Sequence, residues 1–244
     1  MPPNKNEESS TRIIGGRDAI QGRYPYTVSI QRASSLLHFC SGSLIAPDLV
    51  LTAAGCRNRL SNTAIRTNPY RLNLPQEGSE IFSVLAFRSH PEYFEDVRRA
   101  QNFMVLKING TSSQPWIRLN TNRFIPVDGQ PMKSSGWGTI EPDRRIVYPD
   151  VQQEMDGTYL NAKDCANSTH GADYRLAEEA ITNDMMCVIH QTGQACGGDV
   201  GRYSLHNTIS LLLSLFLGAA SHMPRTSTTM NNRKPSGSPG HGKH

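Results

Sequence analysis

The 244 residues can bury a substantial core, in one large domain or in two small ones. The formal net charge of +4 is carried by residues 205–244, which hold four basic side chains and no acidic one, so that the remainder is balanced at 21 basic and 21 acidic side chains. Because residues 1–204 carry equal numbers of basic and acidic side chains, we do not expect nucleic acid as a partner. The longest apolar run, Ile209–Ala220, is about half of the ~20 residues needed to cross a bilayer, so no membrane span is expected.

Short apolar segments separated by turn residues dominate the chain from 26 to 188. They are rich in Val, Ile, Phe and Thr and bounded by Gly, Pro, Asn and Asp, which is typical of β-strands. The predicted strands are Tyr26–Gln31, Phe39–Ile45, Val50–Ala53, Ile81–Phe87, Phe103–Ile108, Met132–Trp137 and Glu154–Tyr159. Short helices are predicted at Asn161–Ser168 and Ala177–Ile181. Many strands with turns between them indicate an all-β barrel or sandwich.

Both ends of the chain lie outside this pattern. Residues 1–12 are polar and lack the apolar core of a secretory signal, so we expect a flexible leader without a signal peptide. Residues from about Pro224 onward are rich in Ser, Thr, Asn, Gly and Pro and are expected to be disordered. Taken literally, the N-terminus indicates a cytosolic protein.

The chain has five cysteines, an odd number, and none of them has the paired spacing of a zinc site. We therefore expect no metal and no cofactor, and in a secreted protein one thiol would lack a partner. Sequons for N-linked glycosylation begin at Asn109 and at Asn167, although motifs this short often arise by chance.

Five motifs follow one another along the chain. They are RIIGG at 12–16, a hairpin of YPYTVSIQ at 24–31 and HFCSGSLI at 38–45, LTAAGC at 51–56, NFMVLKI at 102–108 and ACGGDVGR at 195–202. In sequence and in order they resemble the chymotrypsin/trypsin family of serine proteases, peptidase family S1. The resemblance covers roughly residues 12–201 and then ends.

The resemblance implies an all-β fold of two six-stranded antiparallel Greek-key barrels. The family's last strands and final helix have no counterpart after residue 201, so we expect the second barrel to be incomplete and the C-terminal tail to be disordered. The implied organisation is a leader or activation peptide at 1–12, a trypsin-like domain at 13–204, and an apolar run with a basic tail at 205–244. The run at 209–217 could replace one missing strand.

Activation and disulfides are also implied by the resemblance. In the family, cleavage after a basic residue frees an α-ammonium group that pairs with an aspartate beside the nucleophile, and these roles fall here to Arg12, Ile13 and Asp199. The implied disulfides are Cys40–Cys56 and Cys165–Cys187. Cys196 is left unpaired, because its family partner lies further along and is missing. Disulfides indicate an oxidising compartment, so the family implies an extracellular, secreted protein despite the N-terminus.

All three positions of the catalytic triad are substituted: Gly55 stands at the histidine, Asn102 at the aspartate and Val200 at the serine. In the family the imidazole takes the proton of the nucleophile and returns it to the leaving amine, and the carboxylate holds the imidazole tautomer. None of the three side chains present can do this. Gly198 and Val200 match the oxyanion-hole loop, and Gln194 matches the base of the specificity pocket, where a neutral amide would not attract Lys or Arg.

Three functions follow from this pattern. The first is a non-catalytic family member, a monomer that binds an unknown protein or peptide. The second is a serine endopeptidase that retains trace activity, because binding and an oxyanion hole alone can exceed the rate in water by ~10³–10⁴. The third is a truncated, frameshifted or mis-spliced product without function. We rank the first and third close together and active catalysis below them.

Overall fold

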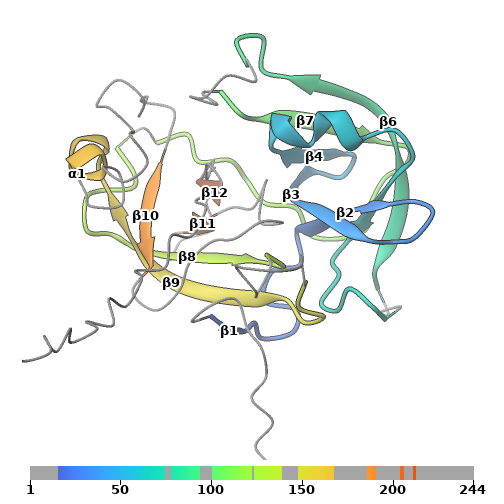
Figure 1. The fold of residues 1–244 in the computed structure, drawn as a ribbon, viewed down its shortest axis with the longest axis horizontal. Coiled ribbons are helices and arrows are strands. Elements are labelled where there is room, and N and C mark those ends of the chain that lie inside the picture. Colours follow the sequence, from blue (N-terminus) through green and yellow to red (C-terminus); the bar gives the residue numbers. More distant parts are fainter. Residues whose placement is uncertain are drawn as a thin grey trace, which may run out of the picture.

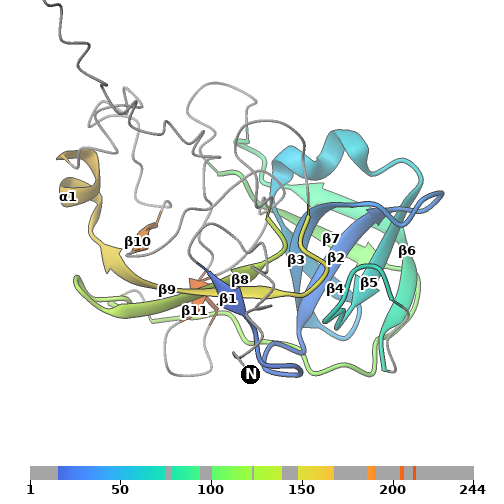
Figure 2. The ribbon, with the colours of Figure 1, turned by 60° about the horizontal axis from the view of Figure 1, so that its bottom comes forward.

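A computed structural model of the chain describes residues 16–74, 78–93, 101–122, 124–138, 148–167, 186–190, 204–205 and 211–212. The predicted all-β class is confirmed, because these residues form a closed six-stranded antiparallel barrel and a second six-stranded sheet (Figure 1). The barrel comes from the first half of the chain. The second sheet comes mainly from the second half and lies beside the barrel (Figure 2).

The barrel is closed by hydrogen bonds around its whole circumference, in the order β2-β3-β4-β7-β6-β5. Its strands are β2 (Thr27–Arg32), β3 (His38–Ala46), β4 (Leu49–Thr52), β5 (Thr63–Thr67), β6 (Glu80–Ser89) and β7 (Met104–Ile108). Alternate residues of each strand point inward, and large apolar side chains fill the interior. The fully buried ones are Val28, Ile30, Leu44, Val50, Ile65, Met104, Leu106 and Ile108. A single packed core therefore fixes the ends of β4 and β7, from which the candidate site is built.

Strand β5 was not predicted, because Thr63–Thr67 contains the charged Arg66 and shows no alternation of apolar and polar residues. All five of its residues are nevertheless buried. The guanidinium of Arg66 donates to the backbone carbonyl oxygens of Leu72, at 3.0 Å, and of Leu74. Burial lowers the pKa of Arg66. The charge is thus accommodated by carbonyl groups of the following loop.

The second sheet follows the order β1-β9-β8-β11-β12, and β10 pairs with the other part of β9. Its strands are β1 (Arg17–Asp18), β8 (Pro131–Gly136), β9 (Gln153–Leu160), β10 (Cys187–His190), β11 (Ser204–Leu205) and β12 (Leu211–Leu212). Within the described residues this sheet does not close on itself. Strand β12 comes from the apolar run at 209–217, the segment considered as a replacement strand.

A buried carboxylate ties the N-terminal segment to the second sheet. The side chain of Glu154 in β9 is only 2% exposed and accepts hydrogen bonds from Tyr24 Oη at 2.7 Å, Arg17 Nε at 2.9 Å and Arg23 Nη1 at 3.3 Å. Burial and the hydrogen bond to Glu154 raise the pKa of Tyr24 far above its usual value. The phenol is therefore protonated at neutral pH and donates its hydrogen to Glu154.

A second, more exposed ion pair lies beside it. Arg17 Nη1 contacts Asp156 Oδ2 at 2.6 Å, and Lys133 contacts the other oxygen of the same carboxylate. These hydrogen bonds, from Arg17 first and Lys133 second, lower the pKa of Asp156 to about 2. Backbone pairing of β1 with β9 completes the attachment, with Arg17 opposite Glu154. Residues 17–24 are thereby held on the second sheet.

All seven predicted strands correspond to observed ones, with ends that differ by a few residues. The helix predicted at Asn161–Ser168 corresponds to α1 (Ala162–Asn167), and the one predicted at Ala177–Ile181 lies outside the described residues. The strands β1, β10, β11 and β12 were not predicted. They have two to four residues each, too few to show a period in the sequence.

Candidate functional site

The pairing of β4 with β7 brings Gly55 and Asn102 together. Thr52 at the end of β4 lies opposite Met104 at the start of β7. A 3-10 helix, η1 (Ala54–Arg59), begins two residues beyond Thr52 and contains Gly55, whereas Asn102 lies two residues before Met104. Residues 47 positions apart in the chain therefore meet at one end of the barrel.

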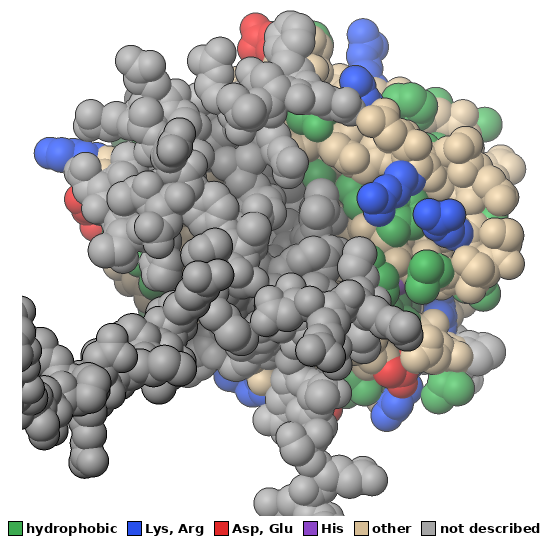
Figure 3. Space-filling view, viewed as in Figure 1, with side chains coloured by type: hydrophobic (Ala, Val, Ile, Leu, Met, Phe, Trp, Pro, Cys, Tyr) green, Lys and Arg blue, Asp and Glu red, His purple; other side chains and the backbone are tan. Residues whose placement is uncertain are grey.

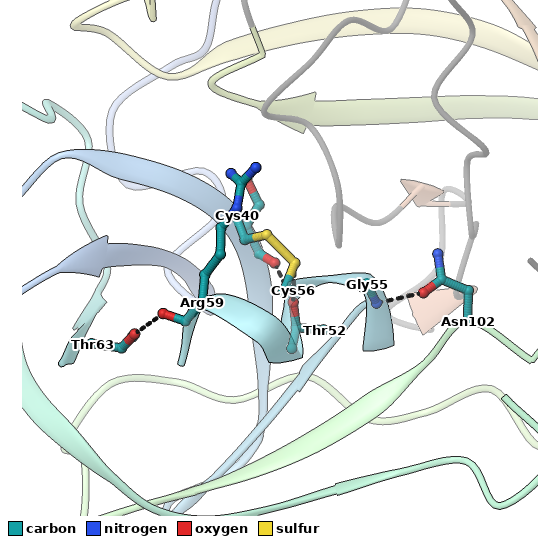
Figure 4. Close-up of a disulfide and its surroundings, with 8 residues drawn as sticks. Cys40, Thr52, Gly55, Cys56, Arg59, Thr63 and Asn102 are labelled. Carbon is teal, nitrogen blue, oxygen red and sulfur yellow. Dashed lines mark hydrogen bonds between the residues drawn. A yellow bond between two sulfur atoms is a disulfide. The ribbon is translucent and has the colours of Figure 1, made fainter. Parts of the chain in front are cut away.

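The contact between them is a direct hydrogen bond. The backbone N–H of Gly55 donates to Asn102 Oδ1 at 2.8 Å (Figure 4). The backbone N–H of Ala54 donates to the carbonyl oxygen of Asn102 at 3.3 Å. The first residues of a helix have no intrahelical partner for their N–H groups, so Asn102 serves as the cap that Ala53, with no side-chain hydrogen bond, does not provide. Asn102 is buried and Gly55 is exposed.

The disulfide Cys40–Cys56 holds η1 against β3, which confirms that predicted pairing (Figure 4). Both cysteines are buried in the barrel core. Thr52 Oγ1 donates to the carbonyl oxygen of Ser41 at 2.7 Å and so adds a second link between β4 and β3. The backbone at Gly55 is thus fixed by a covalent bond on one side and by Asn102 on the other.

Among the described residues, none would clash with a Cβ atom at Gly55. A Cβ atom built there would lie 3.5 Å from Tyr93 Oη and 3.6 Å from Asn102 Oδ1, both ordinary van der Waals distances. Tyr93 was not singled out from the sequence, because nothing in the pattern around it indicates that it comes near residue 55. Its ring also lies under the guanidinium of Arg57, with 5.6 Å between the guanidinium carbon and the ring centroid.

The two histidines that lie nearest in sequence to the site have contacts of their own. His38 is buried, with Nδ1 2.8 Å from Ser29 Oγ, and its ring packs against Trp137 and Tyr148. Because Ser29 is fully buried, a peptide could not reach this pair. His90 packs against Phe103, with 4.6 Å between ring centroids.

The remaining predicted site residues lie outside the described residues: Arg12, Ile13, Gln194, Cys196, Gly198, Asp199 and Val200. Their roles stay predictions. The second predicted disulfide is confirmed, because Cys165 of α1 is bonded to Cys187 of β10. The structure thus brings together two of the predicted site residues, Gly55 and Asn102, and both predicted disulfides.

Chemically, this pair of residues offers a backbone N–H and a neutral amide. Neither group can accept a proton from a nucleophile near neutral pH, because an amide has no titratable nitrogen in that range. Within the described part of the chain, no group of three His, Cys, Asp or Glu side chains is placed to hold a metal ion. In the same part, no helix has the length and apolar character that a membrane-spanning helix needs.

Comparison with known proteins gives consistent matches. Residues 13–202 match the family model Trypsin. The chain is 31% identical to a trypsin of Sarcophaga bullata over 195 residues, which cover 78% of this chain and 72% of that protein. It is 28% identical to trypsin delta of Drosophila melanogaster over 192 residues, 78% of this chain and 72% of the relative. It is 29% identical to trypsin theta of the same organism over 222 residues, 88% of this chain and 80% of the relative.

Proposed function

The chain belongs to the trypsin family of serine proteases, and we propose that within this family it is a non-catalytic member that binds a protein or peptide. The observation that carries the proposal is the hydrogen bond of Gly55 N–H to Asn102 Oδ1. By the family resemblance these are the positions of the catalytic histidine and aspartate. The two groups that meet here are a main-chain amide and a side-chain amide.

The family's reaction needs a proton relay at this point. An imidazole must take the proton of the serine hydroxyl as the oxygen attacks, and the carboxylate must stabilise the imidazolium that forms. Gly55 has no side chain, and the amide of Asn102 carries no charge to balance an imidazolium. Val200, which by resemblance stands at the nucleophile, has no lone pair with which to attack a carbonyl carbon. The family's own route, attack by an activated serine, therefore cannot begin with these residues.

The magnitude of this loss is large. Removing a complete triad costs on the order of 10⁶ in turnover, and the remaining ~10³–10⁴ over the uncatalysed rate comes from binding and the oxyanion hole. The proposal therefore allows a trace of hydrolysis but no physiological protease activity.

A stable fold distinguishes a binding protein from a product without function. The closed barrel with its apolar core and the disulfide Cys40–Cys56 favour a folded protein. We infer that the folded domain spans about 13–204 and that the protein is a monomer in an extracellular, oxidising compartment. The disulfides support this compartment, since such bonds persist where thiols are not kept reduced.

The loss of catalysis is tested with a fluorophosphonate probe, which labels an activated serine. The purified chain should stay unlabelled, whereas an active trypsin in the same assay is labelled. A cooperative thermal transition of the same sample shows that the unlabelled protein is folded. Labelling at any serine would overturn the assignment.

Binding at the vacated site is tested by photo-crosslinking. A photoreactive side chain at Gly55 has room beside Tyr93 and Asn102, because a Cβ atom there would lie no closer than 3.5 Å to any of the described residues. The matched control carries the same group at the exposed Arg118. In extracellular fluid a partner should be captured from residue 55 and not from residue 118. Equal capture at both positions would contradict binding at the site.

A further inference from the structure

The turn after β7 contains the sequon Asn109-Gly110-Thr111. All three residues are exposed. The backbone N–H of Asn109 donates to the carbonyl oxygen of Ser83 in β6 at 2.9 Å, so the main chain is fixed where the side chain leaves it. The preceding residue, Ile108, points into the barrel core and is 1% exposed. Since neighbouring side chains of a strand point to opposite faces, the side chain of Asn109 points outward.

Packing requires a glycine at the central position of this sequon but does not account for the asparagine or the threonine. Gly110 has φ = 145°, and a Cβ atom added there would lie 2.9 Å and 3.0 Å from atoms of the Phe82 ring, so a larger residue would not fit. The side chains of Asn109 and Thr111, in contrast, make no hydrogen bond within the described part of the chain. Their amide and hydroxyl groups are free for recognition by another molecule.

An exposed apolar face lies beside this turn. The outward-facing residues of β6 include Ile81, Leu85 and Phe87, which are 56%, 60% and 53% exposed. Ser83, the partner of the Asn109 main chain, lies between Ile81 and Leu85, and each of these is about 7 Å from it along the strand. Figure 3 shows hydrophobic side chains among polar ones on the surface of the first barrel. Three large apolar side chains exposed on one strand form a surface on which another apolar group can pack.

We propose that Asn109 is the acceptor of an N-linked oligosaccharide, whose first sugar units lie over the apolar face of β6. The proposal rests on the secretory compartment proposed above. The apolar faces of sugar rings can pack on Ile81 and Leu85 while their hydroxyl groups face water. Because the sugar would be bonded covalently to Asn109, whose main chain lies against Ser83, it stays beside this face and does not have to bind from solution.

The modification is a group transfer with no change of oxidation state. The side-chain amide nitrogen of Asn109 attacks the anomeric carbon of an oligosaccharide that is carried on a lipid diphosphate. The bond between that carbon and the diphosphate oxygen breaks, and the lipid diphosphate leaves with the electron pair. The nitrogen gives up one proton to a base of the transferase, and a new nitrogen–carbon bond remains. The transferase recognises the hydroxyl of Thr111, which a serine can replace.

The acceptor is tested by translating the chain, with an added signal sequence, into endoplasmic-reticulum microsomes. The added signal makes the test independent of the chain's own targeting. We expect a glycan that is lost in Asn109→Gln and in Thr111→Ala but retained in Thr111→Ser. Asn167→Gln, which removes the other sequon, is the matched control and should leave the glycan on Asn109. An imported chain whose Asn109 peptide is unmodified by mass spectrometry would overturn the proposal.

The position of the sugar is tested on secreted, folded protein with a dye that fluoresces on exposed apolar surface. Enzymatic removal of the glycan should raise the fluorescence, and this rise should be lost in an Ile81→Thr/Leu85→Ser variant. An equal rise in both proteins would show that the sugar lies elsewhere. Failure of the non-catalytic assignment is a separate result, since it would appear as fluorophosphonate labelling whether or not Asn109 carries a glycan.

Discussion

An imidazole introduced at residue 55 should be sensitive to the charge at residue 102. The Cβ of Gly55→His would meet the described residues only at ordinary distances, 3.5 Å from Tyr93 Oη and 3.6 Å from Asn102 Oδ1. Gly55 is also not one of the residues with positive φ, so a residue with a side chain can adopt its backbone conformation. Adding Asn102→Asp then places a carboxylate beside the new ring with almost no change of shape.

The expected effect follows from Coulomb's law. The ring position is not fixed, so the 3.6 Å from the built Cβ to Asn102 Oδ1 serves as the closest approach of the two charges. At this distance opposite unit charges attract by about 4.6 kcal/mol at an effective dielectric constant of about 20, an upper limit of roughly 3 pKa units. Carboxylates within ~4–6 Å of an opposite charge commonly shift a pKa by about 1–3 units. We therefore expect the imidazole pKa to be about 1–3 units higher in Gly55→His/Asn102→Asp than in Gly55→His.

The measurement is an NMR titration of the imidazole in both variants. A matched control is Gly55→His/Asn109→Asp, which makes the same change at the far end of β7. That residue is seven positions away along the chain, about 23 Å, which exceeds the Debye length of ~10 Å at 0.1 M salt. A shift no larger than in this control would refute the proposed geometry of the site.

Stability should change in parallel. A histidine whose pKa is raised in the folded state contributes stability that is fully present below its unfolded pKa, about 6.5, and that is lost as the pH rises through the folded value. Thermal denaturation of Gly55→His/Asn102→Asp should therefore show its gain over Gly55→His at pH 6 and lose it above about pH 9.

Three further predictions concern the rest of the fold. Cys40→Ala/Cys56→Ala removes the disulfide and should lower the free energy of unfolding, measured by urea titration, by about 3 kcal/mol, because it releases a loop with a sequence separation of 16. An unchanged free energy of unfolding would count against this disulfide in the native protein. Tyr24→Phe should cost about 1.5–3 kcal/mol in the same assay, since it removes the hydrogen bond to the buried carboxylate of Glu154, whereas an unchanged value would show that this bond does not form. Asp156→Asn should lower the melting temperature at pH 6 but not near pH 2. The ionised carboxylate contributes stability above its unfolded pKa of about 3.9, and this contribution is lost as the pH falls through about 2. High salt should reduce the difference in melting temperature, since the side chain of Asp156 is half exposed.

The sequence predicted the parts of the fold that repeat a simple pattern. Strands such as β2 and β7 alternate apolar and polar residues or consist of continuous apolar runs, and both disulfides followed from the family resemblance. It also paired Gly55 with Asn102, because the motifs around them keep the family's order. The hydrogen bond between them confirms that they are neighbours.

What the sequence did not predict depends on contacts between distant segments. Strand β5 is stabilised by burying Arg66 against the carbonyl groups of a following loop, which no local period can reveal. The pairing of Glu154 with Arg17 and Tyr24 joins residues about 130 positions apart. Tyr93, a few residues after the end of β6, comes near Gly55 through contacts that no local pattern reveals.

The attachment of β1 to β9 limits what cleavage after Arg12 could move. Arg17 is held by Glu154 and Asp156, so a new terminus at Ile13 would be joined to a fixed point by a tether of four residues. Such a tether spans at most about 14 Å when fully extended. With Arg17 fixed, any group that captures the freed ammonium must lie within about this reach of Arg17, next to the edge of the second sheet that β1 occupies.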